Sequence, residues 1–432
     1  MMTQQAETLT ATSQTAAPQT STRSNTPPYA LEDLAQPLLA QIPRSAAGVE
    51  RQRLIAGLVD EQSEEFHQQM QSILDYYLHL MEDKEASDID MGANGCAGKV
   101  WYSLHGSKNP LEDITLPMLA TDIMCQSVLN TKQREYLLQH RNLDFSYSLD
   151  KDDGSAQRFR ADMYFDMDHL ALNMRLIQND IRPFKELQLH PEVAKALSLN
   201  YYKSGLTLVT GITGSGKSST LDTIIDANNR TVHSHIVIIA SPVELEHSPK
   251  RSIVRHREVG RDVRSFKDGA VEALRQDPDI IVISELRDPE TIMTALEVSD
   301  SGHKTFGTLH TASAIESIDR IIGEMPPSQQ RRVQNRLADV LTCVISQKLI
   351  PSLDGRRVLA KEVLLVNPSV QAAIRNNNTG EIYQMMQEGT VFGMQTMEQD
   401  LKQLYDTGLI SRTEAVNHAN NKKRIEQLFE FS

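Results

Sequence analysis

Residues 211–218 read Gly-Ile-Thr-Gly-Ser-Gly-Lys-Ser, which matches the pattern G-x-x-x-x-G-K-[ST] at every fixed position. The stretch follows the apolar run 206–210 and precedes an amphipathic segment from Ser219, which is the strand–loop–helix setting that the pattern requires. Glycines let successive backbone N–H groups turn inward around phosphate oxygens at the start of a helix. The stretch predicts a loop that binds a nucleoside triphosphate. The alternative is a glycine-rich turn with a helix cap.

Two side chains of this loop have predicted chemical roles. Lys217 is expected to reach the β- and γ-phosphates of ATP, and the Ser218 hydroxyl is expected to ligate Mg²⁺. The predicted nucleotide-binding residues of the loop are Gly211, Thr213, Gly214, Ser215, Gly216, Lys217, Ser218 and Ser219.

Short apolar runs separated by helical segments continue beyond the loop. These runs are 206–210, 236–239, 280–283, 305–309, 344–347 and 363–366. Strands that are apolar throughout and alternate with helices indicate a parallel sheet covered on both faces, so the fold class is α/β. The tail from about Pro368 is predicted to be helical, with a break at Gly393 and a final amphipathic helix around Met397, Leu401 and Leu404.

Polar residues end two of the apolar runs. Glu285 follows the run 280–283, and we predict that its carboxylate binds Mg²⁺ or polarises the attacking water. His310 ends the run 305–309, and because ligands bind outside the carboxyl ends of parallel strands, it is a candidate γ-phosphate sensor. The alternative for His310 is a structural histidine at a strand end.

The segment 250–264 carries five arginines, which form either a solvated loop or a set of side chains offered to phosphate or to a neighbouring subunit.

The N-terminal half has a different pattern. Residues 1–28 are mainly Ser, Thr, Gln, Ala and Pro and are predicted to be disordered, whereas residues 29–82 show helical periodicity. The acidic stretch 60–65 within them is predicted to be a solvated helix face. Residues 88–91 and 158–164 alternate like half-buried strands, and residues 150–155 contain a predicted hairpin turn.

Composition limits the possible partners and location. The chain has 432 residues and a formal net charge of −13, which disfavours nucleic acid as a direct partner. Its three cysteines are far apart in sequence, so neither a disulfide framework nor a cysteine-rich zinc site is predicted. Since no stretch approaches the roughly 18 apolar residues that span a bilayer, the expected location is cytoplasmic, with any role at a membrane exerted through partners.

Several further motifs accompany the loop. The segments 277–288 (DPDIIVISELRD), 301–311 (SGHKTFGTLHT) and 257–262 (REVGRD) resemble those of the secretion-ATPase (traffic ATPase) superfamily, and within it the PilT-type type IV pilus retraction ATPases. Residues 86–91, 158–160, 373–375 and 393–397 extend the resemblance over about residues 70 to 425.

The resemblance implies a PAS-like α+β domain followed by a RecA-like P-loop ATPase domain, with a helical N-terminal extension and a helical C-terminal tail. The implied bounds are 1–28 disordered, 29–82 extension, 83–185 PAS-like domain, 186–366 ATPase domain and 367–432 tail. It also implies a homohexameric ring that hydrolyses ATP with Mg²⁺, works with an inner-membrane platform protein and has a possible paralogous ATPase as a partner. By the same resemblance, Arg160 and Arg175 bring positive charge to the phosphates.

The chain departs from the family's pattern at one place near the nucleotide. The family's acidic box, E-D-P-x-E, reads Ala-Ser-Pro-Val-Glu at residues 240–244, so Glu244 is the acid that remains and is a candidate catalytic residue. Two functions follow. The first is an ATP-hydrolysing motor for a pilus or for a related conjugation or secretion machine. The second is a nucleotide-binding accessory paralogue with weak hydrolysis, which acts structurally beside a competent motor.

Overall fold

The protein is described by a computed structural model that covers residues 26–104, 107–151, 156–177 and 181–430. Most of the predicted disordered segment 1–28 and most of the predicted turn 150–155 lie outside the described residues. The chain forms two units, and the boundary between them crosses the sheet of the N-terminal half: the described residues up to Leu143 and residues Met163–Asn173 form one unit. The predicted bounds of the five segments stay predictions.

Three helices precede the first sheet, as the periodicity of residues 29–82 predicts. They are α1 (Leu31–Leu39), α2 (Gly48–Asp60) and α3 (Glu64–Asp83). The acidic stretch 60–65 is not one helix face, because α2 ends within it and α3 begins within it. The Ser63 hydroxyl accepts a hydrogen bond from the Phe66 N–H and caps α3, which explains the break.

Helix α2 is joined to the rest of its unit by buried hydrogen bonds. Gln52 on α2 donates to a carboxylate oxygen of Asp122 at 2.8 Å, and both side chains are fully buried. Asp122 lies on α4 (Met118–Ser127), and its other oxygen accepts from the Leu170 N–H at 2.8 Å. Because a buried carboxylate is costly without such partners, these bonds make the helical extension part of the folded unit.

A six-stranded sheet follows, in the order β3-β2-β1-β6-β5-β4. Its strands are β1 (Asp88–Gly92), β2 (Trp101–Leu104), β3 (Ser107–Pro110), β4 (Asn142–Asp150), β5 (Ala156–Asp166) and β6 (His169–Leu176), and helix α5 (Thr131–His140) precedes β4. The predicted strands 88–91 and 158–164 are confirmed as parts of β1 and β5. Alternate β5 residues Phe159, Ala161 and Met163 are fully buried, which is the period of a strand with one face on a core.

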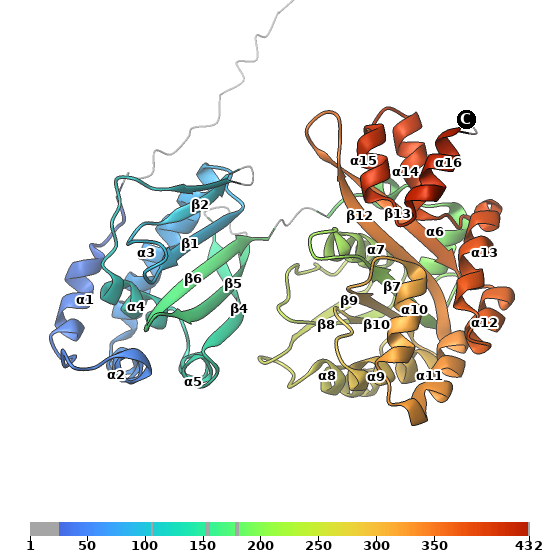
Figure 1. Ribbon diagram of the computed structural model, residues 1–432. Helices are drawn as coiled ribbons and strands as arrows, with labels where there is room; N and C mark the ends of the chain where they lie inside the picture. The colour runs from blue at the N-terminus through green and yellow to red at the C-terminus, as the bar shows by residue number, and fades with distance from the viewer. Residues whose placement is uncertain (1–25, 105–106, 152–155, 178–180, 431–432) are drawn as a thin grey trace, which may run out of the picture. The chain divides into compact units, whose positions relative to one another are not determined.

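The second sheet has seven strands in the order β13-β12-β7-β11-β10-β8-β9 (Figure 1). They are β7 (Gly205–Thr210), β8 (His235–Ala240), β9 (Ile253–Glu258), β10 (Ile280–Ile283), β11 (Lys304–Leu309), β12 (Leu341–Pro351) and β13 (Arg357–Leu365). All six predicted runs are confirmed as strands, and the α/β class is confirmed.

Two features of this sheet differ from the prediction. Strand β13 runs antiparallel to β12, because only residues 352–356 join them and so short a connection makes a hairpin. Strand β9 lies in the arginine-rich segment that was interpreted as a loop or an arginine cluster. It was missed because an edge strand can carry charged residues such as Arg255, which is exposed.

The seven-stranded sheet is covered on both faces, as predicted. Successive strand residues point to opposite faces, so Val237 and Ile281 pack into one core while Ile238 and Val282 pack into the other. Helix α7 (Lys217–Thr231) covers the second of these faces. Helices α8 (Phe266–Ala273), α9 (Pro289–Asp300), α10 (Ala314–Gly323) and α11 (Pro327–Val340) contribute to the first.

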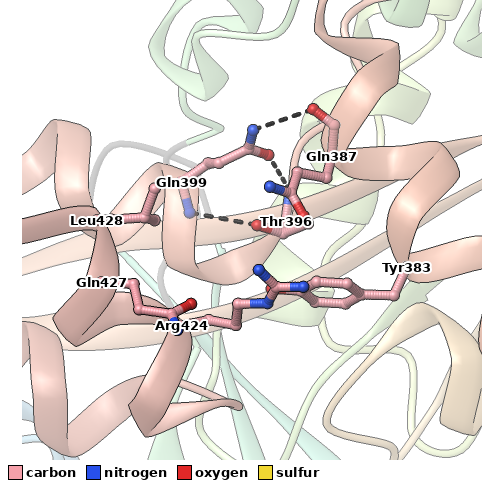
Figure 2. A pocket seen from close by; sticks show the side chains of 7 residues that line it. All are labelled: Tyr383, Gln387, Thr396, Gln399, Arg424, Gln427 and Leu428. Carbon is pink, nitrogen blue, oxygen red and sulfur yellow. Dashed lines mark hydrogen bonds between the residues drawn. The ribbon is translucent and has the colours of Figure 1, made fainter. Parts of the chain in front are cut away.

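The tail is helical, as predicted. It comprises α12 (Pro368–Arg375), α13 (Ile382–Glu388), α14 (Met397–Asp406), α15 (Arg412–His418) and α16 (Lys422–Glu430). Helix α14 is the predicted amphipathic helix, although it is not the last one. Thr396 and Gln399 form a capping box at its start, and Gln399 also donates to the Gln387 carbonyl oxygen at 3.2 Å (Figure 2). Among the described residues, no helix combines the length and the apolar character needed to cross a membrane.

Candidate nucleotide site

The order of the second sheet brings the predicted site residues to one edge. Strands β7, β11, β10 and β8 are parallel neighbours, so their carboxyl ends lie side by side. The phosphate-binding loop follows β7, His310 follows β11, Glu285 lies two residues after β10, and Glu244 lies four residues after β8. The carboxyl edge of a parallel sheet is where α/β proteins bind ligands.

Three glycines give the loop 211–216 its shape. Gly211, Gly214 and Gly216 have φ angles of +150°, +79° and +85°, which residues with a Cβ rarely adopt. A Cβ on Gly211 would lie 2.4 Å from the Ser215 Oγ and 2.5 Å from the Gln347 carbonyl oxygen. The curvature of the loop therefore depends on these residue types.

We expect Gly211→Ala to lower nucleotide affinity at least about tenfold, because the added methyl group must push the loop away from Ser215 and Gln347. Fluorescent-ADP titration measures this change. Gly355→Ala is a matched control, since Gly355 also has a positive φ of +79° but no atom within 4 Å of an added Cβ, in the turn between β12 and β13. Equal affinities of the Gly211→Ala variant and the unaltered protein would contradict this prediction.

The N-terminus of α7 faces the space enclosed by this loop. Gly216 occupies the N-cap position and no side chain caps the helix. An α-helix leaves its first N–H groups without intrahelical acceptors, and those groups carry a partial positive charge. Ser218 and Ser219 in the first turn are exposed. This arrangement suits the phosphates of a nucleotide.

The Lys217 ammonium is folded back over the loop. Its Nζ donates to the carbonyl oxygens of Gly211 at 2.8 Å and Ile212 at 3.0 Å. Burial lowers the pKa of Lys217, and the negative charges of Glu285 and then Glu244 oppose that change. The two carbonyl oxygens are uncharged acceptors for this partly desolvated cation. Phosphate oxygens would be anionic acceptors and would therefore bind the ammonium more strongly.

His310 lies between Lys217 and Glu285. Its Nδ1 is 3.5 Å from the Lys217 Nζ, and its Nε2 is 3.2 Å from a Glu285 carboxylate oxygen. Burial and then the Lys217 charge lower the pKa of His310, which favours the neutral ring near pH 7. The contact with the Lys217 ammonium fits a ring that accepts at Nδ1. The prediction that His310 shares the sheet edge with the loop and Glu285 matches this placement, whereas its sensing role stays a prediction.

Glu285 also contacts an arginine. Its carboxylate is 2.7 Å from the Arg287 guanidinium, and its side chain is 20% exposed. An ionised carboxylate with this much access to solvent can orient a water molecule.

Glu244 lies in the connection between β8 and β9 and is half-buried. The other two positions of the acid box are Ala240, which is the last residue of β8, and Ser241. Neither carries a carboxylate, so Glu244 is the one acid of this box.

Sequence reasoning missed Gln347 on β12. Its Nε2 donates to the Ser215 carbonyl oxygen at 2.7 Å and its side chain is buried, so it supports the loop from the neighbouring strand. The available signal was a polar residue at the end of the apolar run 344–347. Arg320 was also not singled out for the site, and it donates to the His310 carbonyl oxygen at 3.0 Å.

The two arginines taken from the family resemblance lie on the six-stranded sheet. Arg160 is on β5 and Arg175 is on β6. Their role at the phosphates stays a prediction.

The residues at the edge fit a magnesium ion bound with nucleotide. Among the described residues, no three His, Cys, Asp or Glu side chains gather to hold a metal by themselves. Mg²⁺ in phosphate-transfer sites takes few protein ligands and keeps phosphate and water oxygens. The exposed Ser218 hydroxyl and the Glu285 carboxylate are hard oxygen donors of that kind.

A separate pocket lies in the tail and is not part of this edge. It is lined from α13, α14, α16 and the residues just before α14, and it includes Tyr383, Gln387, Thr396 and Arg424 (Figure 2). No residue of the phosphate-binding loop lines it.

Comparisons with known proteins agree with this geometry. Residues 167–427, more than half of the chain, match the family described as type II/IV secretion system protein. The chain is 38% identical over 320 residues to the type IV pilus retraction ATPase PilT of Pseudomonas aeruginosa, covering 74% of this chain and 88% of that protein. It is 33% identical over 345 residues to the type IV pilus ATPase PilU of the same organism, covering 80% and 88%.

A solved structure supports the same relationship. The pilus retraction motor PilT with bound ADP superimposes with a TM-score of 0.73 at 37% identity, covering 82% of this chain and 98% of that chain. Both the sequence and the fold thus confirm the resemblance that the motifs indicate, together with ATP hydrolysis and nucleotide binding. The chain belongs to the type II/IV secretion system protein family and is a secretion and pilus motor ATPase of that family.

Proposed function

We propose that the chain hydrolyses ATP with Mg²⁺ at the carboxyl edge of its seven-stranded sheet and uses the energy to retract a type IV pilus or to drive a related conjugation or secretion machine. The observation that supports this most strongly is the chain of contacts from Lys217 through His310 to Glu285. The Lys217 ammonium and the Glu285 carboxylate lie on either side of one histidine, which supports the roles of phosphate-binding cation and water-orienting acid proposed for them.

Each residue has a defined part in this proposal. The loop N–H groups and Lys217 hold the β- and γ-phosphates, and Glu285 orients the attacking water. Ser218 and Glu285 would hold Mg²⁺, which would supply charge neutralisation at the phosphates. His310 links the two sides, so its contact with Glu285 can report whether the γ-phosphate is present. Glu244 is a second acid within the electrostatic reach of Lys217.

The proposed assembly is a homohexameric ring, peripheral to the inner membrane through a platform protein of the pilus or secretion machine. Arg160 and Arg175 would contribute positive charge to the nucleotide from the N-terminal sheet. Hydrolysis would then change how the two units of the chain are arranged. The support is the 37% identity to a protein named as a pilus retraction motor.

Complementation tests the direction of force. In a bacterium that lacks its own pilus retraction ATPase, we expect expression of this chain to restore pilus retraction, measured by twitching on a surface, because coupled hydrolysis is the proposed activity. The Glu285→Gln variant, expressed at the same level, should not restore it. Restoration by both proteins would contradict coupling to hydrolysis, and pili that stay extended with either protein would contradict the retraction role.

The second candidate function is an accessory ATPase that acts structurally beside a competent motor. The residues Ala240 and Ser241 favour it, since an acid box with one acid has fewer groups to position magnesium or water. The 33% identity to PilU, which is itself named a type IV pilus ATPase beside PilT in one organism, supports the existence of such pairs. Under this alternative, the chain would restore twitching only when a second family ATPase is present.

A further inference from the structure

One face of α7 is attached along its length to the connection between β8 and β9. Asp222, Asp226 and Asn229 follow each other at four- and three-residue spacing, so they share a face of the helix. Each contacts residues 247–251 of the connection. Asn229 is fully buried and donates to the Ser248 carbonyl oxygen at 2.9 Å, while its own side-chain oxygen accepts from the Lys250 N–H at 3.0 Å.

The contact nearest the phosphate-binding loop is made by His247. Its Nε2 lies 3.0 Å from a carboxylate oxygen of Asp222, five residues after Lys217 on α7, and the ring is 2% exposed. Its backbone N–H donates to the His256 Nε2 at 3.0 Å. Burial lowers the pKa of His256 to about 4, so that ring is neutral and can accept this bond near pH 7. Both the side chain and the backbone of His247 are therefore fixed.

The other end of the connection is fixed as well. The Val243 N–H donates to a carboxylate oxygen of Glu258 on β9 at 3.1 Å, and Glu258 is 8% exposed. Glu244 comes directly after Val243 and three residues before His247. It is thus the acid held between two anchored positions, and its charge acts on Lys217.

We propose that His247, held by Asp222, is a positioning residue that fixes the chain around Glu244 for ATP hydrolysis. One helix then determines both positions, because α7 begins at Lys217 and carries Asp222. Residues 240 and 241 carry no carboxylate, so Glu244 alone of the acid box can orient water or the magnesium shell. Its carboxylate must therefore be placed accurately, and the contact between His247 and Asp222 provides that placement. This inference rests on the proposed catalytic use of Glu244.

The first test is steady-state kinetics of the full-length protein. We expect His247→Ala to lower kcat for ATP by between about ten- and a hundredfold while KM and ADP affinity change less than about twofold, because Glu244 is misplaced but the loop is intact. His247→Gln should recover most of kcat, since the glutamine amide N–H can take the place of the Nε2 donor to Asp222. Asp222→Ala, at a partly exposed position, removes the acceptor of the His247 Nε2 bond and is expected to lower kcat in the same way if the His247→Ala variant does not fold. Lys250→Ala removes the neighbouring ion pair with Asp226 and should leave kcat unchanged.

A double-mutant cycle identifies the residue through which His247 acts. In a Glu244→Gln background, His247→Ala should cause no further loss of kcat, because the group that it positions has already been removed. An additional tenfold loss in that background, or a loss of nucleotide affinity equal to the loss of kcat, would overturn the proposal. If Glu244→Gln itself retains full kcat while Glu285→Gln does not, the proposed role of Glu244 fails and the assignment of the ATPase edge stands.

Discussion

Lys217→Ala is expected to weaken ATP binding by at least about a hundredfold while the fold stays intact. The ammonium would make charge-assisted bonds to two phosphates, each worth about 1.5 to 3 kcal/mol, and a loss of about 3 kcal/mol already corresponds to more than a hundredfold in Kd. The nucleotide-free protein should tolerate the change because burial disfavours the charged lysine and its acceptors are uncharged, namely two carbonyl oxygens and the His310 Nδ1. Titration calorimetry with ATP measures the affinity, and thermal unfolding measures the fold.

A matched lysine substitution in the connection between β8 and β9 serves as the control. Lys250→Ala also removes one ammonium, which pairs with Asp226 of α7 rather than with the loop. We expect this control to bind ATP normally. Nucleotide affinity that is unchanged in the Lys217→Ala variant would contradict the assignment of residues 211–218 as the phosphate-binding loop.

Glu285→Gln is expected to bind ATP with an affinity within about threefold of the unaltered protein and to hydrolyse it between about a hundred- and a thousandfold more slowly. The substitution keeps the shape of the side chain and an oxygen that can accept from His310. It removes the negative charge that orients and polarises the attacking water, and general-base groups typically contribute factors of about 10² to 10⁴.

The control for this variant is Glu290→Gln on α9. Glu290 is a largely exposed acid that pairs with Lys267, so its removal costs little and should leave turnover unchanged. A fall in nucleotide affinity as large as the fall in turnover would show that Glu285 serves binding rather than hydrolysis.

The sequence was sufficient to predict much of the nucleotide edge. Runs such as 236–239 and 280–283 are apolar at every position, and such runs form buried parallel strands almost irrespective of their surroundings. Since the carboxyl ends of parallel strands share an edge, polar residues just after these runs were justified candidates for a ligand-binding site. Glu285 and His310 were found in this way, and the structure places their side chains 3.2 Å apart.

Contacts between a loop and a helix could not be predicted in the same way. The His247–Asp222 pair joins residues 25 positions apart, and neither residue lies at a strand end. The same holds for Gln347, whose contact with Ser215 spans 132 positions and depends on β12 pairing beside β7. Periodicity describes which face of an element is buried, but it does not identify which polar side chains meet across elements.

Two errors have a common physical origin at the margins of the second sheet. Strand β9 pairs with one neighbour only, so its sequence need not be apolar, and exposed Arg255 obscured it. Strand β13 lies at the opposite edge, where a five-residue connection from β12 reverses the chain. Burial determines the apolar sequence of a central strand and makes it recognisable. The position and direction of an edge strand depend instead on connection length and turn residues.

ATP hydrolysis at this edge can be tested by measuring ATP turnover of the purified full-length chain beside its Glu285→Gln variant, with saturating ATP and Mg²⁺. We predict turnover at least about a hundredfold above that of the variant. Turnover no higher than the variant's, in a preparation that binds ATP, would contradict the motor account and leave the accessory role in its place.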